Sequence, residues 1–324
     1  MSADKIVAIL GTRYPDFSIE QGILEPLGVR LRSGQGADAS SIVEEARGAE
    51  VILAGSGPRF DAATLARLTC KAVVRYGVGT ESIDVEAAGR LGMWVARVSD
   101  YGTEAVATHA VAMALAGVRR LREADLRIRG QEWGFAPLRP LHLPSAMTVG
   151  ILGAGRIGRH AAGQFAGLGF RVIMHDVMPG VDNPPGTTMV SFEELLSSSD
   201  VLSLHAPGSL HDEPILGEGA IGQLKPGCVL VNTARGTLID QAALARGLAV
   251  DRPGFAALDV FTTEPPDLTA FAGVEDRLLL SPHMAWYTEE SEHDLRSKAA
   301  HEVRRLLLGE RPRDVVTAPS EETR

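Results

Sequence analysis

The chain has 324 residues, of which 45% are hydrophobic and 23% are charged, and its mean hydropathy is +0.04. These values are typical of a soluble globular protein that is long enough to form two hydrophobic cores. The formal net charge of −9 disfavours nucleic acid as a direct partner, and no apolar run has the length that a membrane span needs. The first residues lack a signal-peptide pattern, so we expect a cytoplasmic protein.

Two cysteines, Cys70 and Cys228, lie in apolar, strand-like runs. Neither belongs to a CxxC or Cys/His pattern, so the sequence predicts neither a disulfide framework nor a metal site. We expect both side chains to fill a hydrophobic core.

The first hundred residues alternate short apolar strands with helical segments, which predicts a parallel α/β sheet. The expected elements are Ile6–Leu10, Ser40–Arg47, Val51–Ala54, Ala62–Leu68, Ala72–Tyr76 and Trp94–Val98. A long helical pattern follows over Thr103–Arg129, and its apolar residues must pack against another part of the protein. The Pro- and Gly-rich stretch 130–145 is expected to be a loop.

A glycine turn with the spacing GxGxxG follows the apolar strand at residues 148–152. Gly153 would permit a tight turn, Gly155 would let the backbone approach a pyrophosphate, and Gly158 would let the next helix pack on its strand. The second strand ends at Asp176, whose carboxylate can accept hydrogen bonds from an adenosine ribose. Glycines at this spacing also serve ordinary turns, but with both strands and the acid they predict a dinucleotide-binding unit.

Asp176 also favours NAD over NADP. A carboxylate at the ribose would repel a 2′-phosphate, and the residues that follow it include no Arg or Lys to replace it. A methyltransferase that binds S-adenosylmethionine is an alternative, because it also places an acid after its second strand. Its glycine loop, however, need not carry all three glycines.

The alternation of strands and helices continues after Asp176. The expected elements are Phe192–Leu196, Val201–His205, Cys228–Val231, Gln241–Gly247, Phe255–Leu258, Leu278–Leu280 and the amphipathic helix Glu289–Leu308. We expect this last helix to return to the first domain. The prediction is therefore an α/β protein with two Rossmann-like or flavodoxin-like parallel-sheet domains and a cleft between them. The first domain is discontinuous, with residues 1–99 and 286–324, and the nucleotide-binding domain has residues 100–285.

Three polar residues follow expected strands, at the edge where open α/β sheets place ligand-binding groups. Arg235 stands beside a glycine and suits a two-point grip on a carboxylate. Glu264 lies in a proline-containing turn, and His283 follows the last strand of this domain. Taken singly, they could be a solvated loop arginine, a surface acid and a satisfied core histidine.

Together, these side chains supply what hydride reduction of a 2-keto acid requires. Arg235 would hold the carboxylate and polarise the carbonyl, while His283 would protonate the emerging alkoxide. Glu264 would orient the imidazole and favour its protonated form. We therefore expect all three residues to be catalytic.

The motifs GAGRIG, NTARG, ALDVFTTEP and SPH resemble those of the D-isomer-specific 2-hydroxyacid dehydrogenases, and the likeness covers almost the whole chain. The segment RYGVGTESID looks like the substrate loop of that family, and YGTEAVA resembles the start of its interdomain helix. Within the family, the segments AWYT and AAHEVRR are most similar to the C-terminal-binding-protein branch.

This resemblance implies NAD as the cofactor, a small 2-keto or 2-hydroxy acid as the substrate, a homodimer through the NAD-binding domains, and no metal. The first domain would be the substrate domain. The implied substrate residues are Arg75, Tyr76, Val78, Gly79 and Trp286, with backbone amides of the glycine loop binding the carboxylate. The implied cofactor residues are Gly153, Gly155, Arg156, Ile157, Gly158, Asp176, His205, Ala206, Pro207, Thr233, Ala234 and Asp259. Of these, Thr233 and Asp259 would lie near the nicotinamide carboxamide.

Some features leave the substrate and the function open. The loop has Thr80, Glu81 and Ser82 where relatives often carry a bulky residue, Asp and Asn, and Trp286 could form a pocket wall or pack at a domain interface. The C-terminal-binding-protein branch includes corepressors, so an NAD-responsive binding module is the alternative function. The acidic charge and the lack of an added basic arm favour an enzyme, and the three intact catalytic positions disfavour an NAD-binding protein without catalysis.

Overall fold

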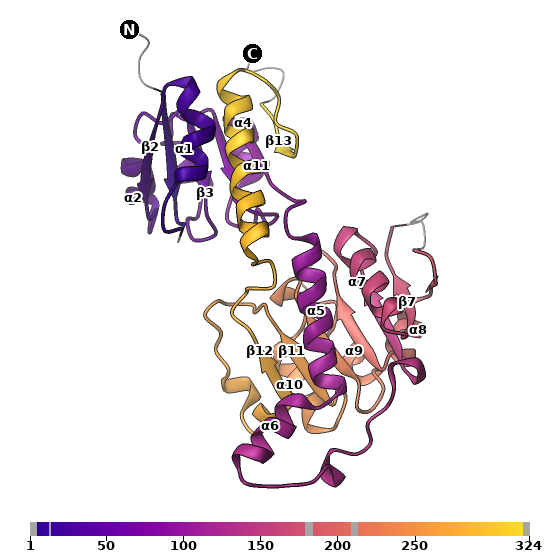
Figure 1. The fold of residues 1–324 in the computed structure, drawn as a ribbon. Helices are drawn as coiled ribbons and strands as arrows, with labels where there is room; N and C mark the ends of the chain where they lie inside the picture. Colours follow the sequence, from indigo (N-terminus) through magenta and orange to yellow (C-terminus); the bar gives the residue numbers. More distant parts are fainter. Residues whose placement is uncertain (1–4, 13, 179–183, 209–212, 320–324) are drawn as a thin grey trace. The chain divides into compact units, whose positions relative to one another are not determined.

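A computed structural model describes residues 5–12, 14–178, 184–208 and 213–319. The chain forms two compact units, which we call unit 1 (Met1–Gly102 and Thr288–Arg324) and unit 2 (Thr103–Tyr287). Each unit contains its own sheet of mainly parallel strands (Figure 1). The predicted α/β class with two parallel sheets is confirmed. No helix in the described ranges is both long and apolar enough to cross a membrane.

Within its described residues, unit 1 has a six-stranded sheet in the order β13-β5-β4-β3-β1-β2. The strands are β1 (Lys5–Leu10), β2 (Val29–Gly34), β3 (Val51–Ala54), β4 (Ala72–Arg75), β5 (Trp94–Arg97) and β13 (Val315–Thr317). All are parallel except β13, which pairs antiparallel with β5. The helices are α1 (Ser18–Leu24), α2 (Ala39–Glu45), α3 (Ala62–Leu65), α4 (Val85–Arg90) and α11 (Glu289–Leu307). Helix α11 lies beside α1, although the two are far apart in the sequence (Figure 1).

In the described part of unit 2, seven parallel strands have the order β12-β11-β10-β9-β6-β7-β8. The strands are β6 (Thr148–Leu152), β7 (Arg171–His175), β8 (Thr187–Met189), β9 (Val201–Leu204), β10 (Val229–Asn232), β11 (Phe255–Leu258) and β12 (Leu278–Leu280). The helices are α5 (Thr103–Val118), α6 (Leu121–Arg129), α7 (Arg156–Gly167), α8 (Phe192–Ser198), α9 (Glu218–Gly222) and α10 (Gln241–Ala249). From β6 the chain winds outward to β7 and later returns to the other side at β9. The switch point of the sheet therefore lies between β6 and β9, where such sheets bind ligands.

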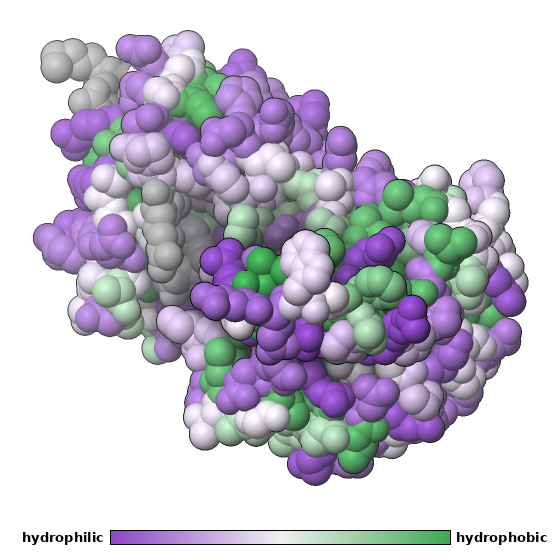
Figure 2. Space-filling model, turned by 60° about the horizontal axis from the view of Figure 1, so that its bottom comes forward, coloured by the Kyte–Doolittle hydropathy of each residue, from purple (hydrophilic) through white to green (hydrophobic). Residues whose placement is uncertain are grey.

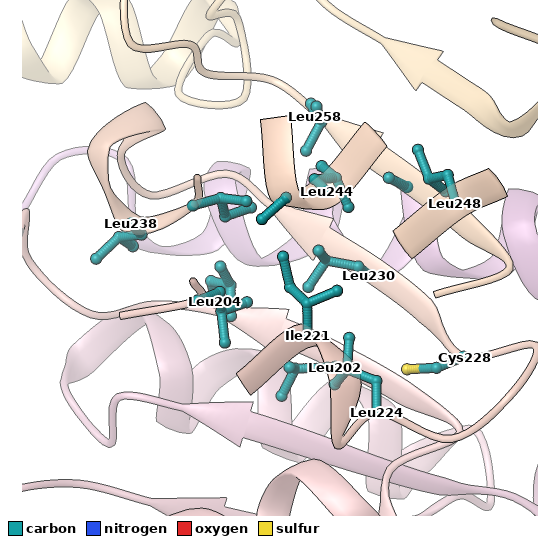
Figure 3. Close-up of a cluster of buried hydrophobic side chains, with 14 of the residues drawn as sticks. Leu202, Leu204, Ile221, Leu224, Cys228, Leu230, Leu238, Leu244, Leu248 and Leu258 are labelled. Carbon is teal, nitrogen blue, oxygen red and sulfur yellow. The ribbon is translucent and has the colours of Figure 1, made fainter. Parts of the chain in front are cut away.

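Both faces of the unit 2 sheet are covered by helices. On one face, Leu202, Leu204 and Leu230 pack with Ile221 of α9 and Leu244 of α10 (Figure 3). On the other face, alternate residues of β6 and β10 pack with α5 and α7. Because neither face meets water, the strands are apolar at consecutive positions, which is the pattern that marked them in the sequence.

The cysteines and two of the predicted helices can be compared with the structure. Cys70 and Cys228 are buried free thiols, and burial raises the pKa of each to about 12, so both are core residues as predicted. The predicted helix Glu289–Leu308 is confirmed as α11. The prediction of one long helix over 103–129 was wrong in one respect, because α5 and α6 are separate helices. Arg120, with a φ of 48°, turns the chain between them.

Candidate active site

The predicted glycine turn lies at the switch point of unit 2. Gly153 has a φ of 99°, and a Cβ added to it would lie 2.7 Å from the Ala206 nitrogen. A Cβ on Gly158 would lie 2.0 Å from the carbonyl oxygen of Gly153, whereas one on Gly155 would meet no atom within 4 Å. Two glycines are therefore required by close packing, and the third leaves the N-terminus of α7 open. An open helix N-terminus fits a pyrophosphate group.

Asp176 follows β7 and is fixed against this turn. Its Oδ2 accepts a hydrogen bond from the Ala154 amide at 2.7 Å, and its Oδ1 accepts one from the Met178 amide at 2.9 Å. In the first turn of α7, Arg156 is exposed and Ile157 is half-buried. The predicted cofactor residues of β6, α7 and β7 thus lie together at one edge of the sheet.

The residues after β9 and β10 contribute two buried polar atoms that have no hydrogen-bond partner in the described chain. Nε2 of His205 lies 2.9 Å from the Ser203 hydroxyl, but its Nδ1 has no hydrogen-bond partner among the described residues, and neither has Oγ1 of Thr233. Burial lowers the pKa of His205 to about 4, so the imidazole is neutral near pH 7. Buried polar groups are seldom left unpaired. These two atoms therefore fit a polar ligand that reaches along the strand ends, as an extended dinucleotide would.

His283 and Glu264 form a hydrogen-bonded pair. They follow β12 and β11, which are neighbours in the sheet. Nδ1 of His283 lies 2.8 Å from Oε2 of Glu264, and Oε1 of Glu264 accepts the Phe261 amide at 3.2 Å. The side chains are 47% and 38% exposed, respectively, so the pair is open to a ligand. The predicted pairing of these two residues is thus present in the geometry.

Arg235 follows β10 and comes close to the same region through its neighbouring glycine. A Cβ on Gly236 would lie 2.0 Å from the carbonyl carbon of Phe261, so the turn that carries Arg235 packs directly against the turn that leads to Glu264. The Asn232 side chain shapes the Arg235 turn by donating to the Arg235 carbonyl at 2.8 Å. Sequence reasoning missed Asn232, although a buried amide at the end of an apolar strand is a signal for such a role.

The turn that carries His283 is held by Asp259. His283 has a φ of 51°, which is uncommon for a residue other than glycine, and its amide donates to the Asp259 carbonyl at 2.8 Å. The buried Asp259 carboxylate accepts the amides of Met284 and Ala285, each at 2.9 Å, and the Ser281 hydroxyl at 2.5 Å. The contacts of Asp259 in the described chain thus hold the turn that carries His283. The prediction placed Asp259 near the nicotinamide carboxamide and did not include this role.

Another residue that sequence reasoning missed, His109, approaches this turn from α5. Its Nε2 lies 3.1 Å from the Ser281 hydroxyl and 3.8 Å from Oδ1 of Asp259. The apolar pattern of α5 identified a buried helix but did not single out this histidine. The signal was its imidazole in the middle of a mainly apolar helix.

The predicted substrate loop lies in unit 1, directly after β4. Gly77 has a φ of 128°. In the part of the chain that the structure describes, the amides of Val78 and Gly79 donate no hydrogen bond, so both are available to an anion. Arg75 donates to the Ala54 carbonyl at 3.3 Å, and Tyr76 is turned inward, with 5% of its surface exposed.

Trp286 lies three residues beyond His283 in unit 2 and is half-buried. Its ring meets that of Tyr287 edge-on, with 5.7 Å between the ring centres. The structure thus gives Trp286 an aromatic neighbour, and its predicted role as a pocket wall stays a prediction.

A glycine turn at the switch point of a parallel sheet, with an acid after the next strand, defines a Rossmann-type dinucleotide-binding protein. The family model for "D-isomer specific 2-hydroxyacid dehydrogenase, NAD binding domain" matches residues 111–285. The chain belongs to the D-isomer-specific 2-hydroxyacid dehydrogenases, as its motifs predicted. The match also confirms NAD, predicted from Asp176, as the cofactor of this domain.

Several characterised proteins are similar to the chain. The D-3-phosphoglycerate dehydrogenase of Mycobacterium leprae is 33% identical over 304 residues, which are 92% of this chain but 57% of that protein. The chain thus spans little more than half the length of that relative. The glyoxylate reductase of Aeropyrum pernix is 34% identical over 289 residues, 85% of each chain. The structure of D-lactate dehydrogenase from Aquifex aeolicus with NAD and lactic acid has a TM-score of 0.86 at 27% identity, and the match covers 97% of this chain and 100% of that one.

Proposed function

We propose that this protein is an NAD-dependent oxidoreductase that reduces a small 2-keto acid to the D-2-hydroxy acid. The observation that carries this proposal is the hydrogen bond of 2.8 Å between His283 and Glu264, which lie at adjacent strand ends beside the Arg235 turn. The bound nicotinamide would supply the hydride. The proton and the grip on the substrate then come from this chain's own side chains.

His283 is the proposed proton donor. Its Nδ1 is engaged by Glu264, which leaves Nε2 as the ring atom that can give a proton to the substrate oxygen. Glu264 fixes the ring and stabilises its protonated form. Arg235 binds the substrate and polarises its carbonyl, because a guanidinium offers two parallel donors.

The remaining predicted residues divide between cofactor and substrate. We assign the pyrophosphate to the glycine turn and the adenosine ribose to Asp176. The other proposed cofactor residues are Arg156, Ile157, His205, Ala206, Pro207, Thr233, Ala234 and Asp259. In unit 1, the unengaged amides of Val78 and Gly79 suit a carboxylate, with Arg75 beside them.

The substrate itself is proposed only as a class. The relatives named above are a phosphoglycerate dehydrogenase, a glyoxylate reductase and a lactate dehydrogenase, so members of the family differ in the group attached to the 2-keto acid. If Trp286 is a pocket wall, each buried methylene-sized group of a longer substrate gains about 0.8 kcal/mol. Longer 2-keto acids should then be better substrates than glyoxylate.

We also propose a homodimer formed through unit 2. The segment from α6 to residue 143 exposes large apolar side chains, including Ile128 (53%), Trp133 (92%), Phe135 (65%) and Leu143 (69%). This segment runs along the outside of the unit (Figure 1), and Figure 2 shows hydrophobic residues, in green, at several places on one face of the molecule. Apolar side chains concentrated in this way indicate a contact surface. Replacing Trp133 and Phe135 by Ser should give a monomer in light scattering, and an unchanged mass would refute the interface.

The decisive experiment measures NADH oxidation with glyoxylate, pyruvate, hydroxypyruvate and longer 2-keto acids. Replacing His283 by Ala should lower kcat by about 10²–10⁴-fold, the usual contribution of a positioned general acid, with little change in the Kd for NADH. His293→Ala is the control, because that histidine is exposed on α11. Near-native kcat in His283→Ala would assign the proton to another group. NADH binding without turnover of any 2-keto acid would instead support the NAD-responsive binding module.

A further inference from the structure

Unit 1 contains a buried ionic network that the proposed reaction does not use. Glu20 of α1 is 0% exposed, Arg296 of α11 is 4% exposed and Tyr76 is 5% exposed. Nε and Nη2 of Arg296 donate to the two oxygens of Glu20 at 3.0 and 2.9 Å. The Tyr76 hydroxyl donates to Oε1 of the same carboxylate at 2.9 Å. One buried carboxylate is thus bound by a guanidinium and a phenol.

The Arg296 guanidinium also contacts the segment that follows β1. Nη2 of Arg296 donates to the Asp16 carbonyl at 2.7 Å, and its Cζ lies 4.6 Å from the centre of the Tyr14 ring. Tyr14 meets Tyr76 edge-to-face, with 5.3 Å between ring centres. The network therefore connects the segment after β1, the end of β4 and helix α11.

Stability alone does not explain this arrangement. Removing two charges from water is costly, and apolar residues of similar size often hold a protein together as well as a buried ion pair does. The phenol also has a defined state, because burial and the neighbouring Glu20 raise the pKa of Tyr76 well above its usual value. Its hydroxyl therefore remains a hydrogen-bond donor to Glu20 at any pH at which the protein is used.

The position of Tyr76 indicates what the network serves. Tyr76 is the last residue before Gly77, and the amides of Val78 and Gly79 have no acceptor in the described chain. The Gly77 amide donates to the Arg75 carbonyl at 3.0 Å, and the Val98 amide donates to the Gly77 carbonyl at 3.2 Å. The guanidinium groups of Arg75 and Arg97 donate to the carbonyls of Tyr76 and Val78, the latter at 3.4 Å. These contacts hold loop carbonyls, and the Tyr76 side chain adds an anchor that connects the base of the loop to α1 and α11.

We propose that the Glu20–Arg296 pair, acting through the Tyr76 hydroxyl, positions the amides of residues 78 and 79 to bind an anionic group of the substrate. This inference rests on the proposed function, in which that group is the carboxylate of a 2-keto acid. Tyr76 is then a positioning residue and not a contact of the substrate. Arg296 has a second effect, since it neutralises the Glu20 charge that would otherwise repel an anion at the loop.

The test is Tyr76→Phe, which removes one hydroxyl and leaves the ring packing and the ion pair in place. We expect the KM for the best 2-keto acid, and the inhibition constant of oxalate, to rise about tenfold, while kcat and the Kd for NADH stay within twofold. Hydrogen exchange of the amides of Gly77 and Val98, which do donate hydrogen bonds at the base of the loop, should become faster. A residue that serves only stability would lower the melting temperature without this separation of KM from kcat.

Glu292→Gln is the matched control. Its carboxylate lies 3.6 Å from Nη1 of Arg296, but the contacts of the Tyr76 hydroxyl do not include it, so KM and loop exchange should not change. Unchanged KM and unchanged loop exchange in Tyr76→Phe would overturn the proposal. If the wild-type protein reduces no 2-keto acid, the proposed function fails, and the exchange measurement still decides whether Tyr76 orders the loop. A double variant, Glu20→Gln with Arg296→Met, should reproduce the faster exchange without an unpaired buried charge.

Discussion

The two sheets are wound in the same way around their first strand. In unit 1, β1 lies between β2 and β3, and in unit 2, β6 lies between β7 and β9. Each unit also has one very close backbone approach near this point. A Cβ added to Gly55 would lie 2.0 Å from the carbonyl oxygen of Gly11. A Cβ added to Gly158 would lie 2.0 Å from the carbonyl oxygen of Gly153.

The two units differ in the residues that come after the first strand. In unit 2, α7 begins directly after Gly155, and the next strand is followed by Asp176. In unit 1, the short α1 begins only at Ser18, carries the buried Glu20, and is followed by a strand that ends at Gly34 without an acid. Winding order thus creates a ligand-binding edge, whereas a few residues at that edge decide which ligand is bound.

The largest expected effect comes from filling the close approach in each unit. Gly158→Ala and Gly55→Ala should each destabilise the protein by about 1–3 kcal/mol, because the backbone must shift to admit a methyl group. Only Gly158→Ala should abolish NADH binding in a fluorescence titration. Gly163→Ala is the control in α7, since its Cβ would meet no atom within 4 Å. Native NADH affinity in Gly158→Ala would remove the distinction between the two units.

The next largest effect is expected at Asp176, the acid that follows the second strand of unit 2. With Asp176 in place, NADH should be preferred over NADPH by on the order of several kcal/mol, because a carboxylate and a 2′-phosphate repel each other. Asp176→Ala should weaken NADH binding and narrow this gap, as measured by kcat/KM with each cofactor. Asp125→Asn, at an exposed position of α6, should change neither value. Equal kcat/KM of the wild type with both cofactors would contradict the assignment.

His205 should make unit 2 sensitive to acid. Its pKa is lowered by burial from 6.5 to about 4, so the unfolded chain binds the proton first and stability falls as the pH drops from about 6.5 to about 4. The loss is at most about 3 kcal/mol. Urea unfolding of His205→Asn should show a flatter acid limb, whereas His160→Asn, at an exposed position of α7, should keep the steep one. Identical slopes in all three proteins would rule out His205 as the source.

The smallest effect is expected at Glu264, which belongs to an exposed pair, unlike the buried Glu20 of unit 1. Glu264→Gln should move the pH profile of 2-keto acid reduction downward, because a neutral amide stabilises an imidazolium less than a carboxylate does. Initial rates between pH 5 and 9 would measure this. Glu193→Gln, at an exposed position of α8, is the control. A profile that does not move would mean that the pair in the structure does not govern protonation.

Much of unit 2 could be predicted because parallel sheets have a strong sequence signature. Their strands are apolar on both faces, and ligand groups follow such strands at one edge, so the places of Arg235, Glu264 and His283 at strand ends could be predicted. Of the edge strands in the described chain, β12 was predicted, but β2, β8 and β13 could not be found in this way. In β2, Arg30 and Arg32 alternate with apolar residues, and β8 and β13 have three residues each. Charged or very short edge strands oppose aggregation but weaken the sequence pattern.

The part of the site that was missed depends on contacts between distant residues. No local spacing links Glu20 with Arg296, or His109 with Ser281. The available signal was weaker: Arg296 stands beside Leu295 on the buried face of α11, and a buried charge requires a partner. Such a signal indicates that Arg296 has an acidic partner but does not identify which residue it is.

The arrangement of unit 1 has a consequence for synthesis on the ribosome. Arg296 follows Glu20 by 276 residues, and β13 reaches β5 later still, after all of unit 2 has been made. At 5–20 residues per second, about 14–55 s pass between the synthesis of Glu20 and that of its counter-ion. The outer edge of β5 is likewise uncovered, and open to wrong pairing, until β13 has been made. The nascent chain therefore completes its inserted unit before the two sequence segments of unit 1 can pack together.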